Sequence, residues 1–172
     1  MLIFLVGFMG SGKTTLGRPL ATRLNYDFID LDRAIETGEG RTISEIFATD
    51  GEAHFRALER KYLEEVIAQH KKAVISTGGG TPCFNENMPF MNAHGVTVYL
   101  KIAPRMLANR LLAAKVRRPL VEGKSPEELL RYIEETLTER ETYYGQANVV
   151  VGNPSRDVSQ LLMILEPYLS NN

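Results

Sequence analysis

Cysteine and tryptophan are scarce in this sequence, whose 172 residues contain one cysteine, Cys83, and no tryptophan. One cysteine cannot close a disulfide within the chain and cannot build a cysteine cluster for a metal ion. Neither sign of charge is in excess, because 20 basic and 21 acidic residues give a formal net charge of -1. That balance argues against nucleic acid or an anionic membrane as a partner.

Long apolar runs are also missing. No stretch approaches the roughly 18 apolar residues of a membrane span, and no basic segment with a cleavage site precedes the first apolar run. We therefore expect a protein of the reducing cytoplasm that has no nucleic-acid partner and no membrane partner. We also expect a monomer.

The sequence does contain a regular alternation of short apolar runs and amphipathic segments, without a repeat or a low-complexity linker. The length of 172 residues predicts a single domain, residues 1–172. Strands are expected at about residues 2–6, 27–32, 73–76, 96–100 and 149–151. Because helices separate these strands, the pattern predicts a three-layer α/β/α fold around a five-stranded parallel sheet.

A phosphate-binding loop follows the first expected strand. Gly7, Gly12, Lys13 and Thr14 have the spacing G-x-x-x-x-G-K-[ST] between a buried strand and a helix. The glycines let backbone N–H groups converge on phosphate oxygens, and the helix adds its positive N-terminal end. Lys13 is placed to reach the outer phosphates, and the Thr14 hydroxyl can ligate Mg²⁺. The sequence therefore predicts a site for a nucleotide with Mg²⁺.

Two carboxylates close the second expected strand, residues 27–32. The side-chain period of two puts Asp30 and Asp32 on one face of that strand. If the strand is parallel to the first, both carboxylates lie at the end of the sheet that holds the phosphate loop. The alternative is a pair of aspartates that cap the next helix. On a loose phosphoryl-transfer pathway, Asp32 can act as a base with an ordinary low pKa.

Two further motifs have a functional and a structural interpretation. Arg56 and Glu59 lie one turn apart on an expected helix, residues 52–68, so the carboxylate can orient the guanidinium. The alternative is a weak surface ion pair. Gly78–Gly80 directly follow the third strand and indicate a close approach of backbone to a ligand or to another segment. The alternative is a flexible turn.

An arginine occupies a core-facing position near the end of an expected helix, residues 125–144. Arg140 continues the apolar stripe of that helix, and a buried guanidinium needs an anionic partner. The partner can be a protein carboxylate or the carboxylate of a substrate. The basic segment before this helix, residues 115–124, indicates a lid that closes over the nucleotide, or else a solvated loop. In that segment Arg118 is the favoured phosphate contact and Arg117 the alternative.

In this order and spacing, the motifs resemble those of shikimate kinases over nearly the whole chain. The matching residues are Gly7 to Thr14, Asp30-Leu31-Asp32, Phe55-Arg56 with Glu59, Gly78 to Gly80, Arg118-Pro119-Leu120, and Arg140 with Tyr144. The resemblance implies a P-loop kinase fold with a mobile lid at about 112–124 and a substrate-binding helical segment at about 33–61. It implies that ATP phosphorylates the 3-hydroxyl of shikimate, a step of the shikimate pathway to chorismate and aromatic amino acids.

The resemblance also assigns roles to residues. Asp32 would hold the substrate hydroxyls and take a proton, while Lys13 and Arg118 would stabilise the transferring phosphoryl group. Thr14, and Asp30 through water, would hold Mg²⁺. The residues assigned to ATP are Gly10, Ser11, Gly12, Lys13, Thr14, Thr15, Arg110, Arg118, Asn153 and Pro154. Those assigned to shikimate are Asp32, Phe47, Phe55, Arg56, Gly78, Gly79, Gly80 and Arg140.

Other functions share the phosphate loop. A kinase of gluconate or of a nucleoside monophosphate has the same size and a similar lid, but the D-x-D pair together with Gly78–Gly80 favours shikimate. A nucleotide-dependent switch of the GTPase type predicts the strings N-K-x-D and D-x-x-G, and neither occurs in the sequence. One departure from the shikimate kinase pattern is Thr142, where the family often has proline, so we expect the helix that carries Arg140 to run further.

Overall fold

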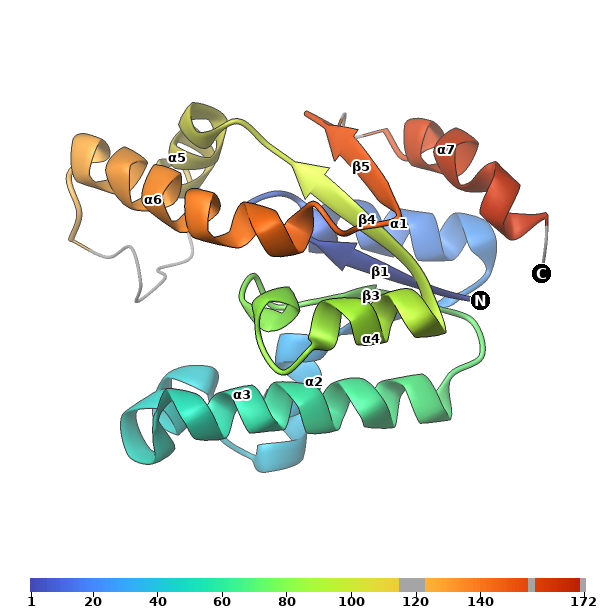
Figure 1. Cartoon of the computed structure of the whole chain (residues 1–172), viewed down its shortest axis with the longest axis horizontal. Coiled ribbons are helices and arrows are strands. Elements are labelled where there is room, and N and C mark those ends of the chain that lie inside the picture. The colour runs from blue at the N-terminus through green and yellow to red at the C-terminus, as the bar shows by residue number, and fades with distance from the viewer. Residues whose placement is uncertain (115–122, 155–156, 171–172) are drawn as a thin grey trace.

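The computed structural model describes residues 1–114, 123–154 and 157–170. Five parallel strands form one sheet in the order β2-β3-β1-β4-β5, which confirms the expected sheet (Figure 1). The strands are β1 (Leu2–Val6), β2 (Asp27–Asp30), β3 (Ala73–Ser76), β4 (Gly95–Lys101) and β5 (Val149–Gly152). β1 lies at the centre, so the phosphate loop leaves the middle of the sheet.

Helices connect successive strands. They are α1 (Lys13–Leu24), α2 (Leu31–Glu39), α3 (Ile43–Gln69), α4 (Asn87–His94), α5 (Pro104–Leu112), α6 (Pro126–Tyr144) and α7 (Ser159–Leu169), with a 3₁₀ turn η1 (Thr81–Cys83). α3 starts with a capping box formed by Thr42 and Glu45. It is interrupted at Gly51, whose φ of 80° is outside the helical range. α6 begins after the Ser125 cap and ends at Tyr144.

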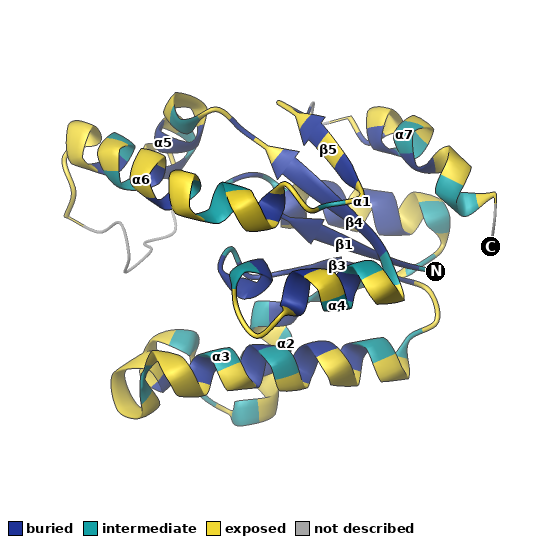
Figure 2. Cartoon of the chain, in the orientation of Figure 1, coloured by how far each residue is buried: buried dark blue, intermediate teal, exposed yellow. Residues whose placement is uncertain are grey.

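The alternating side chains of β1 build the core on both faces of the sheet. Phe4 and Val6 pack with α2, α3 and α4 on one face, whereas Ile3 and Leu5 pack with α1 and α7 on the other. A smaller apolar cluster joins α5 and α6 around Phe8. Figure 2 shows β1, β3 and most of β4 in dark blue and the outer faces of α3 and α6 in yellow. The buried strands therefore hold the loops at their carboxyl ends in place.

No helix in the described ranges is long and apolar enough to span a membrane.

β2 is shorter than predicted, and this changes how its aspartates meet. The strand ends at Asp30, which is the N-cap of α2 and accepts a hydrogen bond from the backbone N–H of Arg33 at 3.4 Å. Asp32 belongs to the first turn of α2, so the prediction that both carboxylates share a strand face is wrong. A short polar side chain at Asp30 satisfies an otherwise unpaired N–H of the helix, which favours the helix over a longer strand.

Candidate active site

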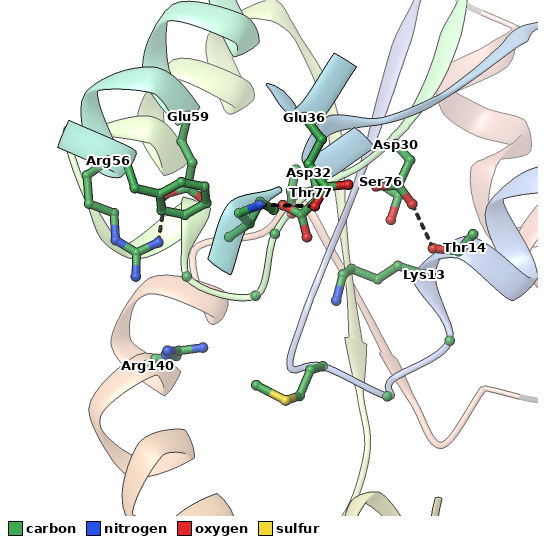
Figure 3. A pocket seen from close by; sticks show the side chains of 18 of the residues that line it. Lys13, Thr14, Asp30, Asp32, Glu36, Arg56, Glu59, Ser76, Thr77 and Arg140 are labelled. Carbon is green, nitrogen blue, oxygen red and sulfur yellow. Dashed lines mark hydrogen bonds and ion pairs between the residues drawn. The ribbon is translucent and has the colours of Figure 1, made fainter. Parts of the chain in front are cut away.

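A cleft of about 610 Å³ opens at the carboxyl ends of β1, β2 and β3 (Figure 3). Its walls come from the loop after β1, from α1, α2, α3 and α6, and from the glycine turn after β3. The lining residues are Met9, Gly10, Gly12, Lys13, Thr14, Thr15, Asp30, Asp32, Glu36, Ile43, Phe47, Phe55, Arg56, Glu59, Ser76, Thr77, Gly78, Gly79, Gly80 and Arg140. Every residue that the sequence predicts to contact shikimate therefore lines one cleft.

The phosphate loop leads directly into α1. Gly12 has φ of 101° and precedes the first helical residue, Lys13. In the described structure no side chain caps this N-terminus and no acidic residue lies in its first turn, so its N–H groups can receive an anion. The Lys13 ammonium group donates to the carbonyl oxygens of Gly7 at 2.8 Å and Phe8 at 3.1 Å, which holds it beside the loop.

A second hollow of about 120 Å³ adjoins the loop. It is lined by Gly10, Ser11, Gly12, Thr15, Leu16, Arg110 and Pro154, most of which the sequence assigns to ATP. Arg110 donates to the carbonyl oxygens of Gly10 and Ser11 at 3.3 and 3.2 Å. Asn153 precedes Pro154, and its N–H donates to the Lys101 carbonyl at 2.8 Å. The hollow shares Gly10, Gly12 and Thr15 with the larger cleft.

Thr14 and Asp30 meet at the edge of the cleft. The Thr14 hydroxyl donates to Asp30 Oδ2 at 3.1 Å. Hydroxyl and carboxylate oxygens are the hard ligands that Mg²⁺ prefers, and Mg²⁺ commonly takes only one or two protein ligands alongside substrate phosphates. The described residues hold no cluster of three or more histidine, cysteine, aspartate or glutamate side chains for a metal ion, which is compatible with such a site. The pair therefore fits Mg²⁺ brought in with a nucleotide.

Asp32 has the most perturbed carboxylate of the cleft. Burial, together with the nearby negative charges of Asp30, Glu59 and Glu36, raises the pKa of Asp32 to about 6, whereas Lys13 lowers it. The sequence allows Asp32 an ordinary low pKa, but the folded site does not. The main cause is burial of the carboxyl group, and the surrounding carboxylates add to it.

Arg56 is held by carboxylates of its own helix. Its Nη1 donates to Glu59 Oε2 at 2.7 Å, and its Nε and Nη2 donate to Glu52 at 3.2 and 2.9 Å. Glu59 is 1% exposed and also accepts a hydrogen bond from the buried Thr81 hydroxyl. This confirms that a carboxylate orients the guanidinium, because Glu59 is buried in the cleft wall rather than placed on a surface.

The three glycines after β3 allow close packing at the cleft. A Cβ atom at Gly80 would lie 2.7 Å from Arg56 Nη1, and one at Gly78 would lie 2.8 Å from Asp32 Oδ1. The Gly79 carbonyl accepts a hydrogen bond from Tyr144, which ties the turn to α6. The turn is therefore a site of close approach, as one of the two interpretations of the sequence predicts.

Replacing Gly80 by alanine should displace the Arg56 guanidinium, because the new methyl group would overlap it. We expect the KM for the carboxylate substrate to rise on the order of tenfold, the cost of one misplaced charge-assisted hydrogen bond. Steady-state kinetics would measure this. Gly152→Ala is the matched control, since no atom lies within 4 Å of a Cβ there. An unchanged KM in Gly80→Ala would show that the guanidinium position does not matter.

Arg140 presents a guanidinium to the cleft from α6. Tyr144 is its hydrogen-bonding neighbour, and Phe8 lies with its ring centroid 5.8 Å from Cζ. Among the described residues, no carboxylate lies within 4 Å of this guanidinium. In Figure 3, Arg56 and Arg140 lie on one side of the cleft and Lys13 lies on the other. The expected anionic partner is thus not a carboxylate of the described chain.

The remaining predicted residues divide into two groups. Phe47 and Phe55 form a pair with ring centroids 4.6 Å apart that walls the cleft. Arg118, Arg117 and most of the expected lid at about 112–124 lie outside the described residues.

Five further residues line the cleft without having been singled out from the sequence: Met9, Glu36, Ile43, Ser76 and Thr77. Of these, Glu36 is the most predictable from the sequence, because a carboxylate one helical turn after Asp32 lies on the same side of the helix.

Comparison with known proteins identifies the family. The family model for shikimate kinase matches residues 9–165. The chain belongs to the shikimate kinase family. A shikimate kinase of Azobacteroides pseudotrichonymphae is 50% identical over 167 residues, which cover 97% of this chain and 98% of that relative. The family membership decides for shikimate over gluconate or a nucleoside monophosphate as the acceptor.

Solved structures agree with this assignment. The crystal structure of shikimate kinase from Bacteroides thetaiotaomicron has a TM-score of 0.92 at 45% identity and covers 96% of this chain and 98% of its own. The structure of Acinetobacter baumannii shikimate kinase in complex with shikimate has a TM-score of 0.84 at 36% identity, covering 99% and 94%. The chain is an enzyme, a P-loop kinase that uses ATP to phosphorylate shikimate in the pathway to aromatic amino acids.

Proposed function

We propose that the cleft binds shikimate through its carboxylate and transfers the γ-phosphoryl group of ATP to the 3-hydroxyl, giving shikimate 3-phosphate and ADP. The observation that supports this most is the pair Arg56 and Arg140 in one cleft with Asp32 and the phosphate loop. An anionic alcohol held by the arginines would direct its hydroxyl groups away from its carboxylate. Asp32 lies where those hydroxyl groups could be bound.

The two arginines recognise the carboxylate by forked hydrogen bonds. A planar guanidinium donates two parallel N–H bonds to a carboxylate, which fixes orientation as well as charge. Arg140 brings a cation without a carboxylate neighbour in the described structure, and Arg56 brings one oriented by Glu59. The backbone of Gly79 lies close to Arg140, because a Cβ there would be 3.4 Å from Nη1. Together they form an anion site at one end of the cleft.

Asp32 binds the substrate hydroxyl groups and accepts the proton of the attacking one. With its pKa raised to about 6, Asp32 is mostly ionised at neutral pH and still basic enough to take a proton. Lys13 supplies positive charge where negative charge develops on the transferring group. Catalysis then rests mainly on positioning and on charge neutralisation, as phosphoryl transfer requires.

Thr14, and Asp30 through water, would hold Mg²⁺. When bound with ATP, Mg²⁺ neutralises phosphate charge and orients the phosphate chain. The hydrogen bond between Thr14 and Asp30 shows that both oxygens reach the same point beside the phosphate loop. Binding of Mn²⁺ to the nucleotide complex, followed by its electron paramagnetic resonance spectrum, would test this pair through Asp30→Asn independently of turnover.

The pH dependence of kcat/KM should reflect the ionisation of the Asp32 carboxyl group. Only the ionised carboxylate can take the proton, so kcat/KM for shikimate should fall about tenfold per pH unit below a midpoint near 6. Glu36→Gln removes one negative charge that raises the pKa of Asp32 and keeps an acceptor for the Ile43 N–H, so the midpoint should move to lower pH. A profile that is flat down to pH 5 would contradict this role.

The position of the new phosphate can be read directly. Incubation with shikimate, ATP and Mg²⁺ followed by ³¹P NMR should give a phosphomonoester resonance coupled to the proton on carbon 3. A resonance coupled to the proton on carbon 4 or 5 would overturn the proposed orientation.

We also propose the wider organisation predicted from the sequence. Residues 33–61 act as the substrate-binding helical segment, since Glu36, Phe47, Phe55 and Arg56 all line the cleft from it. The chain works as one domain, residues 1–172, and as a cytoplasmic monomer. The lid at about 112–124 and its Arg118 stay predictions from the sequence.

A further inference from the structure

An aromatic side chain that the motifs do not include covers Arg56. Phe84 follows η1 and is 38% exposed. The Arg56 Cζ atom lies 4.1 Å from the centroid of the Phe84 ring, within the range of a cation–π contact. The exposed ring therefore has a specific contact on its inner face.

The backbone after Phe84 is strained in a way that supports this contact. Asn85 and Glu86 have φ of 50° and 53°, the left-handed region that residues with a side chain adopt only at an energetic cost. Asn85 Nδ2 donates to the backbone carbonyl of Arg56 at 2.8 Å. Two consecutive left-handed residues and this cross-link attach the Phe84 segment to α3 beside Arg56.

The contacts of Arg56 leave part of its guanidinium for a ligand. Of its five N–H donors, Nε–H, one on Nη1 and one on Nη2 are engaged by Glu52 and Glu59. Two donors remain without a partner among the described residues. Glu59 and Glu52 accept from N–H groups at the edge of the guanidinium, whereas its Cζ lies 4.1 Å from the Phe84 ring centroid and 5.4 Å from that of Phe55. Phe84 is therefore the nearer of two rings that restrict the orientation of this cleft-lining group.

We propose that Phe84 is a positioning residue for shikimate binding, which holds the Arg56 guanidinium in the plane that its free N–H groups need to meet the substrate carboxylate. This inference rests on the proposed role of Arg56. Without the ring, the guanidinium can tilt out of that plane while keeping its carboxylate neighbours. The carboxylate would then be bound less well, and the chemistry at the other end of the substrate would change little.

Kinetics of Phe84 variants test the proposal. Phe84→Leu keeps apolar volume and removes the aromatic face, so KM for shikimate should rise about three- to tenfold, while kcat and KM for ATP stay within twofold. Phe84→Tyr keeps the face and should restore the wild-type KM. A wild-type KM in Phe84→Leu, or a failure of Phe84→Tyr to restore it in a folded protein, would overturn the proposal.

The chain offers a matched control on the same helix. Arg60 lies one turn beyond Arg56, and its Cζ is 3.7 Å from the centroid of the Phe90 ring. Arg60 does not line the cleft among the described lining residues. Phe90→Leu should therefore leave both KM values unchanged. An equal rise in KM for shikimate would show a general effect of removing an aromatic side chain from this surface and would overturn the specific role of Phe84.

Two variants separate this inference from the proposed function. If Phe84 acts through Arg56, then Phe84→Leu should add no further rise in KM when Arg56 is already alanine. If Arg56→Ala itself leaves KM for shikimate unchanged, both the role of Arg56 and that of Phe84 are overturned. If Arg56→Ala raises KM and Phe84→Leu does not, only the inference about Phe84 is overturned.

A spectroscopic test does not depend on turnover. The chain has no tryptophan, so Phe84→Trp introduces a single tryptophan beside Arg56, whose emission can be excited selectively. Addition of shikimate without ATP should change its emission, and the change should disappear in the Arg56→Ala background. Emission that does not respond to saturating shikimate would contradict a ring in contact with the carboxylate-binding group.

Discussion

Asp32→Asn should lower kcat at least about a thousandfold while the folded protein becomes more stable. The loss follows from removal of the only proposed base and of a hydroxyl ligand, and general base catalysis alone contributes about 10²–10⁴ in rate. Asparagine keeps the shape and the hydrogen-bonding oxygen, so shikimate should still bind. Steady-state kinetics and thermal unfolding of the same preparations would measure both effects.

The gain in stability follows from the raised pKa. Because the pKa of Asp32 is raised from 3.8 to about 6 in the folded state, the folded chain binds more protons than the unfolded chain between these values. Stability therefore falls as pH rises through that window, and the full penalty is present at neutral pH. Removing the charge should return about 3 kcal/mol at pH 7.5, or several degrees in Tm.

Asp50→Asn is the control for Asp32→Asn. It removes a carboxylate from the same part of the chain, one that pairs with Arg41 at 2.7 Å outside the cleft. It should leave kcat unchanged and give no gain in stability. An Asp32→Asn protein that keeps a tenth or more of wild-type kcat would remove Asp32 from the role of base.

Arg140→Ala should lower kcat/KM for shikimate by several hundredfold, mainly through KM. Hydrogen bonds to charged groups contribute about 1.5–3 kcal/mol each, and a forked pair gives specificity in addition. Arg140→Lys should recover only part of the loss, because an ammonium group lacks the fork. Titration calorimetry with shikimate would confirm that binding, not chemistry, is lost.

Arg131→Ala provides the comparison for Arg140→Ala. Arg131 is an exposed residue of the same helix, α6, and does not line the cleft. Its removal should leave kcat/KM within twofold of wild type. A fall of less than tenfold in Arg140→Ala would mean that the substrate carboxylate is bound elsewhere.

Motifs defined by local spacing predict much of this enzyme. Gly7 to Thr14 predict both the loop and the start of α1, because strand burial, glycine freedom and helix polarity all act over a few residues. Arg140 interrupts the apolar stripe of a helix, and this position alone predicts that its guanidinium has an anionic partner. Most of the residues that line the cleft belong to the predicted motifs.

Contacts between distant segments were not predictable in the same way. The pKa of Asp32 is raised first by burial and then by Asp30 and by Glu59 of α3, so it depends on how distant segments pack around this carboxyl group. The sequence around Asp30 is compatible with a longer strand and with a helix cap, and in the structure Asp30 caps α2. The end of β2 therefore could not be predicted from these residues alone. Phe84 contacts Arg56 across 28 positions of the chain, and a lone aromatic residue after a turn carries no periodicity.

The most direct test of the account is the rate of ADP release with ATP, Mg²⁺ and each acceptor in turn: shikimate, gluconate and a nucleoside monophosphate. The account predicts rapid turnover with shikimate and only background release with the other two. At a shikimate concentration well below the wild-type KM, release should fall strongly in both Asp32→Asn and Arg140→Ala. Equal or faster release with gluconate or with the nucleoside monophosphate would contradict it.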